Sequence, residues 1–567
     1  MSAGIETQVP PSSLVARVKQ RFARIVENPN PIWARELQQS IRRGHTPAAL
    51  MLVTGAAALL VAAVGGSVGV FRSPATTGSV IYQTFFSIAF FLVLLLGPAL
   101  AANAIVSERE GRTWEAVLLT GMRPTEIARG KFLSAFTNIG LYIVALAPVG
   151  ALSFLFGGVT ALDVVFAFAY LFAFAALSVA FGLAISSKMQ RLGTAIVTTL
   201  LLAVHFAMPA YFTAGVGLSV GAHELWPRIP EGTPVWLPIA YERATFGIDY
   251  VYFLIALPIV VLGIPAWFFY EATIANLAAV SDDRSSGLKR WFFASSVALV
   301  LVGTVLPFRT GYEALMGATA AVVVFAAFLG FACFVFVGEP LGPSRRVRAD
   351  WARRNASRLV RFMGPGLVNT FWLVLGTGLV GLGILIAVGF VAISASPGLT
   401  SHEITKFAFF TVYATSFFIF LAGFCTWMRA RSNAPGSART TTIIAIASIA
   451  IAPWLLAAAA GVLSDVDNAL VFASFSPFYA FAMAEAGNLH GVANHTIVTF
   501  GLVACVAWVA LGLAGFFVGK ARCEKAVREH EALLVETDRL LEAEDRAAQA
   551  AAAGVSVPGD SVEPSAP

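Results

Sequence analysis

The sequence predicts an all-α polytopic membrane protein with about twelve transmembrane helices, and three observations support this prediction. Of its 567 residues, 58% are hydrophobic and only 12% are charged, a composition typical of multi-pass membrane proteins and not of soluble domains. Uncharged segments that are long enough for a helical span recur along the chain. Lysine and arginine are concentrated in alternate connecting segments, as the positive-inside rule requires.

The spans are placed on the uncharged segments. We expect them near residues 48–71, 80–105, 133–157, 164–186, 194–220, 250–270, 291–308, 314–338, 367–394, 407–428, 440–464 and 496–519. Residues 468–484 are also uncharged, but Ser476 and Pro477 interrupt this short stretch. We therefore expect it to form a re-entrant or interfacial helix.

The basic residues predict the orientation. All but five of the 38 Lys and Arg residues fall on one side of the predicted topology; the exceptions are Arg72, Arg228, Arg243, Arg309 and Lys406. Basic loops are retained in the cytoplasm, so we expect both termini to be cytoplasmic. The net charge of +6 then reflects topology, and no nucleic-acid partner is expected.

Residues 1–47 are predicted to form cytoplasmic amphipathic helices, and no signal peptide is expected because the apolar core of such a peptide is absent. The first helix is basic, and we expect it to lie on the membrane surface. Its apolar residues recur at helical spacing and are Val15, Val18, Phe22, Ile25 and Val26. The second helix follows a break at residues 28–31. We expect Trp33, Leu37 and Ile41 on its apolar face, and Arg35, Glu36, Gln38, Arg42 and Arg43 on its polar face.

The spans are interpreted as two six-helix repeats, residues 48–280 and 290–520, followed by a cytoplasmic tail at 521–567 that is helical to about Ala553. The repeats are related by an offset of roughly 240 residues. Residues 187–191 resemble residues 429–433, and residues 238–241 resemble residues 477–479. A rival register, in which Trp351 corresponds to Trp33, remains open.

The polar segment 106–131 lies between the second and third predicted spans. Thr113 can cap a short helix in which Trp114, Val117 and Leu118 fall at positions i, i+3 and i+4. The solvent-exposed side of this helix is expected to carry Glu110, Arg112 and Glu115. An exposed tryptophan beside carboxylates is typical of an interface anchor; the alternative is that Trp114 lies in the lipid headgroups. Pro124 is well placed to begin the next helix.

A spaced set of residues in this segment carries a family resemblance. The set consists of Glu108, Glu110, Gly111, Thr113, Glu115, Leu118, Leu119, Thr120, Pro124, Glu126, Ile127, Gly130 and Lys131. It resembles the first cytoplasmic loop of ABC transporter permeases of the type-2 exporter class. Residues 30–37 are similar to the entry of these permeases, where an interfacial elbow helix precedes the first span.

In that family the loop carries a coupling helix that docks on the ATPase. The resemblance therefore implies that ATPase coupling involves Glu108, Glu110, Gly111, Thr113, Trp114, Glu115, Val117, Leu118, Glu126, Gly130 and Lys131. The sequence departs from the usual family pattern at two positions. Arg112 is inserted between Gly111 and Thr113, and Arg123 stands where a serine usually precedes the proline. We expect these changes to alter the cap chemistry while the spacing is kept.

The resemblance implies a membrane-spanning permease component of an ATP-driven export system in the bacterial cytoplasmic membrane. No G-x-x-x-x-G-K-[ST] phosphate loop occurs in the sequence, so we expect ATP hydrolysis in separate subunits, as a dimer at the cytoplasmic face. We expect no enzymatic activity, catalytic residue, metal or cofactor in this chain.

Two alternatives to this function stay open. One is a non-transporting ABC-associated membrane protein that transmits force or a signal. The other, a secondary transporter, is disfavoured because the predicted spans hold almost no ionisable groups apart from His205. The sequence does not identify a substrate.

Overall fold

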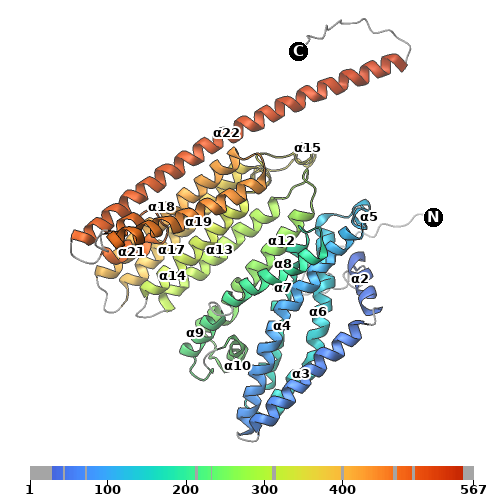
Figure 1. The fold of residues 1–567 in the computed structure, drawn as a ribbon, viewed down its shortest axis with the longest axis vertical. Helices are drawn as coiled ribbons and strands as arrows, with labels where there is room; N and C mark the ends of the chain where they lie inside the picture. The colour runs from blue at the N-terminus through green and yellow to red at the C-terminus, as the bar shows by residue number, and fades with distance from the viewer. Residues whose placement is uncertain are drawn as a thin grey trace, which may run out of the picture. The chain divides into compact units, whose positions relative to one another are not determined.

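A computed structural model describes residues 29–552 except 43–44, 70–72, 211–214, 231–232, 310–313, 397–400, 464–468 and 488–491. All regular structure in these residues is helical (Figure 1). The first predicted amphipathic helix, around residues 15–26, lies outside them. The chain divides into two compact units, Met1–Ala298 and Leu299–Pro567, and the division falls within helix α13 (Ser286–Arg309).

The first unit begins with the short helix α2 (Pro31–Arg42), which is followed by long apolar helices. These are α3 (His45–Gly69), α4 (Pro74–Glu110), α6 (Pro124–Leu155), α7 (Ala161–Ser186) and α8 (Leu192–Ala210), with the short helix α5 (Trp114–Leu119) between α4 and α6. Shorter elements follow: α9 (Gly217–Leu225), η2 (Pro234–Ile239), α10 (Ala240–Arg243), α11 (Ile248–Tyr250), the π-helical turns η3 (Val251–Ala256) and η4 (Ile259–Gly263), and α12 (Ile264–Leu277).

The second unit contains the remaining helices. They are α14 (Ala314–Phe336), α15 (Arg345–Arg353), α16 (Arg358–Met363), α17 (Leu367–Ser394), α18 (Ser401–Arg431), α19 (Pro435–Leu463), η6 (Leu470–Ala473), α21 (Tyr479–Ala486) and α22 (Val492–Ala552).

The predicted multi-pass helical fold is confirmed. Within the described residues, eleven helices are long and apolar enough to cross a membrane, and the apolar stretch Leu192–His205 is shorter. This stretch lies where the fifth predicted span, 194–220, was expected. There, α8 ends at Ala210 and α9 begins at Gly217, and residues 211–214 between them lie outside the described part of the chain.

The last span and the tail form one helix. We expected a span at 496–519 and a tail that is helical to about Ala553, and both belong to α22, which runs unbroken for 61 residues. The interrupted stretch at 468–484 forms the two short elements η6 and α21, neither of which is long enough to span a membrane. Ser476, which was expected to break this stretch, is buried, and its hydroxyl donates to the carbonyl of Ala450.

Glycines permit the closest helix contacts inside each unit. In the first unit, a Cβ added to Gly182 of α7 would lie 2.5 Å from the carbonyl oxygen of Pro98 in α4. In the second, a Cβ on Gly423 of α18 would lie 1.8 Å from the carbonyl oxygen of Gly512 in α22. Neither position accepts a larger residue without movement of backbone, which is typical of tight packing between membrane helices.

The two units share an arrangement of tyrosines. Tyr170 of α7 lies 6.0 Å from Tyr241 of α10 between ring centroids, and Tyr413 of α18 lies 6.2 Å from Tyr479 of α21. The hydroxyl of Tyr241 donates to the carbonyl of Leu254, and that of Tyr479 donates to the carbonyl of Ile497 at 3.0 Å. In each unit, therefore, a short helix contacts an earlier long helix, α7 or α18, and is hydrogen-bonded to the span that follows it.

Candidate functional site

The loop between α4 and α6 begins with a well-formed helix stop. The amide of Thr113 donates to the carbonyl of Glu108 at 2.9 Å, and the amide of Arg112 donates to that of Arg109 at 3.2 Å. These two bonds form a Schellman motif, whose penultimate residue adopts the left-handed conformation that glycine favours. Here that residue is Arg112, with φ of 56°, while Gly111 stands one position earlier with φ of −76°. The inserted arginine therefore occupies the position where a glycine would be unstrained.

The short helix α5 lies at the predicted position, but its capping differs from the prediction. Thr113 directly precedes α5, and its hydroxyl donates back to the carbonyl of Glu108 at 3.3 Å. At the other end of the loop, Pro124 begins α6 as predicted. There, the Glu126 carboxylate accepts a hydrogen bond from the amide of Arg123 at 3.0 Å. Glu126 thus satisfies one of the donors that every helix N-terminus leaves unpaired.

The exposed apolar face predicted for α5 is wrong. Val117 is only 7% exposed and belongs to the core of the first unit. Trp114 is partly buried against the same core, and the Arg109 guanidinium lies 5.4 Å from its ring centroid. The side chain of Leu118 lies outside the described part of the structure. The large apolar side chain that α5 does expose is Leu119, which is 87% exposed, and Glu115 is exposed as predicted. The helix is therefore rotated relative to the prediction, because its tryptophan and valine are used to attach it to the protein.

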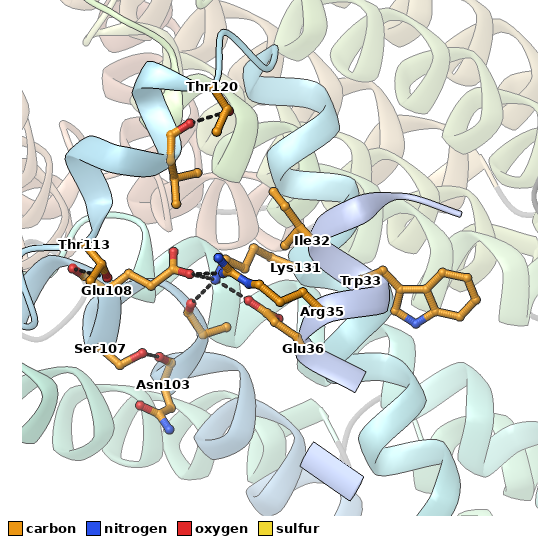
Figure 2. Close-up of polar contacts among 12 residues, drawn as sticks. Ile32, Trp33, Arg35, Glu36, Asn103, Ser107, Glu108, Thr113, Thr120 and Lys131 are labelled. Carbon is orange, nitrogen blue, oxygen red and sulfur yellow. Dashed lines mark hydrogen bonds and ion pairs between the residues drawn. The ribbon is translucent and has the colours of Figure 1, made fainter. Parts of the chain in front are cut away.

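A buried lysine joins three helices beside this loop (Figure 2). Lys131, in the second turn of α6, is 1% exposed. Its Nζ lies 2.8 Å from Oε1 of Glu108 at the end of α4, forms an ion pair with Glu36 of α2, and donates to the carbonyl of Ala104 at 2.7 Å. Arg35 of α2 also pairs with Oε1 of Glu108, at 2.8 Å. We call Arg35, Glu36, Glu108 and Lys131 the lysine cluster.

The lysine cluster corrects one expectation for α2. Glu36 was assigned to the solvated face, but its side chain is 17% exposed and points to Lys131 (Figure 2). Burying a lysine is costly unless carboxylates and hydrogen bonds compensate for lost hydration. Lys131 has both: the carboxylates of Glu36 in α2 and Glu108 in α4, and the carbonyl of Ala104, also in α4.

Helix α2 lies directly against the start of α6. Asn30 accepts the amide of Ile32 at 3.0 Å and donates to the carbonyl of Glu126 at 2.9 Å. A Cβ added to Gly130 would lie 2.5 Å from Oδ1 of Asn30 and 2.8 Å from Cβ of Ile32. Farther along, the Trp33 indole donates to the Thr137 hydroxyl at 3.2 Å. Gly130, predicted as a coupling residue, is therefore a point where α6 approaches the start of α2 closely.

The end of α4 also holds the connection between α7 and α8. The carboxylate of Glu110 accepts the amide of Leu192, the first residue of α8, at 3.1 Å. The Arg109 guanidinium donates to the carbonyl of Met189 at 3.1 Å. Glu110 was expected on the wet side of the loop, and it is exposed as well as bonded. Arg109, Arg112, Trp114 and Glu115 line an open hollow on the surface beside these contacts.

The structure thus sorts the predicted coupling residues into two groups. The first group makes contacts within the protein and consists of Glu108, Glu110, Val117, Glu126, Gly130 and Lys131. Glu115, in contrast, faces outward, as does the neighbouring Leu119. Sequence reasoning missed Asn30 and the roles of Arg35 and Glu36. A signal was available, because the segment 30–37 had been recognised as an elbow. The sequence contains no indication of its partner, α6, whose contacting residues lie 96 and 104 positions farther along the chain.

Comparison with known proteins finds a family similar to part of the first unit. Residues 47–240, which run from α3 to the start of α10 and contain the loop, match the model of the family described as ABC-2 family transporter protein. A comparison with curated proteins finds no match. The family match and the eleven apolar helices agree with the sequence resemblance. Over residues 47–240 the chain is therefore similar to ABC type-2 permeases, and its apolar helices are those of a multi-pass membrane protein.

Proposed function

We propose that this chain is the membrane-spanning part of an ATP-driven ABC exporter whose ATPase subunits are separate polypeptides. They dock, as a dimer, at the face that carries the loop between α4 and α6. The arginine and lysine bias supports a cytoplasmic position for this face and for both termini in a bacterial cytoplasmic membrane. We further infer from the tyrosine arrangement that the two units are repeats of one design.

The lysine cluster is the observation that carries the proposal. A docking helix can transmit a displacement only if it is attached to the spans that must move. Helix α5 follows a hydrogen-bonded stop at the end of α4, and α6 starts five residues after it. The buried Lys131, itself in α6, forms ion pairs with Glu108 of α4 and Glu36 of α2, and so connects α4 and α6 to α2. A force applied at Leu119 or Glu115 is therefore delivered to two spans and the elbow helix together.

The experiment measures MgATP hydrolysis that co-purifies with the tagged full-length chain in mild detergent. The chain stripped of other polypeptides should hydrolyse no ATP. Leu119→Asp and Glu115→Lys should each lower the co-purifying activity at least tenfold, since truncating an interface anchor often costs about 2 kcal/mol or more. Trp114→Ala is a poorer probe, because Trp114 also packs against the core.

The matched control is Leu540→Asp, which changes another exposed leucine, on α22, far along the chain from the loop. It should leave the co-purifying hydrolysis unchanged. ATP hydrolysis by the stripped chain, or equal recovery of activity with all three variants, would overturn the proposed docking. If docking holds, ATP-dependent movement of a substrate in proteoliposomes separates an exporter from a component that only transmits force.

A further inference from the structure

Helix α16 presents an unusual surface next to a membrane span. It follows a second Schellman stop, in which Asn355 has φ of 49° and the amide of Ala356 donates to the carbonyl of Trp351 at 2.9 Å. Ser357 caps the helix by accepting the amide of Val360. Within its six residues, Leu359 is 70% exposed and Val360 is 50% exposed, and Arg358 and Arg361 are exposed beside them.

The arginines of α16 differ in their partners from those of the preceding helix α15. In the preceding helix, Arg345 pairs with Asp538 at 2.7 Å and Arg348 pairs with Glu531. Asp350 lies 3.7 Å from Arg353 and 3.1 Å from Arg354. In contrast, neither Arg358 nor Arg361 has a carboxylate within ion-pair distance among the residues that the structure describes. The two arginines, three residues apart, therefore lie on one side of α16, and the exposed Leu359 and Val360 lie on the other.

The connection of α16 to the span α17 indicates its depth in the membrane. Only Gly364, Pro365 and Gly366 separate α16 from the span α17. They are buried, and they are held by the Glu339 carboxylate, which accepts the Gly366 amide at 3.2 Å. Trp372, one turn and a half into α17, is 43% exposed, and exposed tryptophans mark the membrane–water interface. Helix α16 thus lies at the level of the lipid headgroups.

We propose that α16 binds anionic phospholipid headgroups, with Arg358 and Arg361 on the phosphates and Leu359 and Val360 inserted at the interface. Basic side chains next to apolar ones at this depth are the composition of a lipid-binding surface segment. A second copy of the α5 docking site is disfavoured by charge: α5 exposes Glu115, whereas α16 carries two arginines and no acidic residue. A partner surface complementary to one would repel the other. This inference does not depend on the proposed ATPase.

The test uses the full-length chain with Leu359→Cys labelled by the environment-sensitive fluorophore NBD. The four native cysteines are buried, so the label goes to the introduced site. The protein is placed in nanodiscs of phosphatidylcholine alone, or with about one third phosphatidylglycerol. We expect a blue-shifted, brighter emission in the anionic discs. It should be lost near 1 M salt, where the screening length falls to roughly 3 Å.

Arg358→Gln and Arg361→Gln should each lower the bound-to-free ratio of the labelled helix about fivefold, because a basic residue near an anionic leaflet contributes about 1 kcal/mol. The control label at Leu540→Cys, on an exposed residue of α22, should not respond to lipid charge. A label at Val360→Cys repeats the test without altering Leu359. Emission that is equal in both discs overturns the proposal. Loss of co-purifying ATPase activity in the arginine variants, without a lipid response, would assign α16 to protein docking instead.

Discussion

Gly130 of α6 and Asn30 at the start of α2 are so close that a Cβ on the glycine would stand 2.5 Å from the amide oxygen of the asparagine. Because Asn30 also caps α2 and bonds the carbonyl of Glu126, it cannot move away without releasing both helices. The contact adds to those of Trp33 with Thr137 and of Glu36 with Lys131 in fixing α2 to α6, just after the loop between α4 and α6.

Replacement of Gly130 by alanine should therefore destabilise the first unit. Overpacking of a tight contact typically costs about 1–3 kcal/mol, and here the clash involves Asn30 and the Cβ of Ile32. Thermal unfolding in detergent, followed by intrinsic fluorescence, should show a lower midpoint. Gly193→Ala in α8 is the control, since nothing lies within 4 Å of its added Cβ. A midpoint for Gly130→Ala at or above that of the control would contradict the close packing.

Removal of the Lys131 charge should strongly lower the free energy of unfolding of the first unit. Lys131→Met leaves Glu36 and Glu108 without their buried cation, and breaking such a pair costs about 3–5 kcal/mol. Adding Glu36→Gln should restore part of the lost stability, because one of the uncompensated carboxylates is then neutral. The control is Lys525→Met, whose 3.7 Å pair with Glu529 is solvent-exposed and so contributes about 0–1 kcal/mol. Equal effects of the two methionine substitutions would refute a structural role for the cluster.

Replacement of Arg112 by glycine should stabilise the loop. A residue with a Cβ in the left-handed conformation costs roughly 1–2 kcal/mol, and glycine removes this cost where φ is 56°. Arg112→Ala is the informative comparison, since it removes the same charge but keeps the Cβ. We expect a higher unfolding midpoint for the glycine variant only. If both variants gain equally, the effect is one of charge and not of backbone conformation.

Membrane orientation can be tested at exposed loop positions. Ser73→Cys should react with an impermeant maleimide in intact cells, whereas Asn433→Cys should react only after lysis; both positions are exposed. Ser187 and Ser285 lie in loops predicted to be cytoplasmic, but both are 2% exposed and would not report accessibility. Labelling of Asn433→Cys in intact cells would reverse the predicted orientation of the second half.

The parts of the site that were predicted depend on local signals. Pro124 marks the start of α6 and Thr113 the residue before α5, because proline and hydroxyl residues act on the backbone next to them. The buried face of α5 was not predictable in this way. Its helical period left Trp114 and Val117 together on one side, but whether that side meets solvent or protein depends on α4 and the core.

The lysine cluster was out of reach of the sequence for a similar reason. Glu108 and Lys131 were both selected, yet only as members of a motif. Their partners lie far away in the chain: Arg35 is 73 residues before Glu108, and Glu36 is 95 residues before Lys131. The charge pattern alone predicted that Glu36 lies on the solvent-exposed face of its helix. Only the tertiary fold shows that it neutralises a buried cation.

Because α22 is one unbroken helix, a tilt of its membrane span would also move the part of the helix that follows the span. The part after Lys520 extends for roughly 50 Å at 1.5 Å per residue, and no loop interrupts it. A tilt of about 5° in the membrane would move its far end sideways by ~4 Å. Arg345 and Arg348 of α15 form ion pairs with Asp538 and Glu531 in this part of α22. A sideways movement of α22 would therefore also displace the segment that leads into α16 and α17. A small tilt of the span in α22 would thus be transmitted to α17 as a larger displacement outside the bilayer.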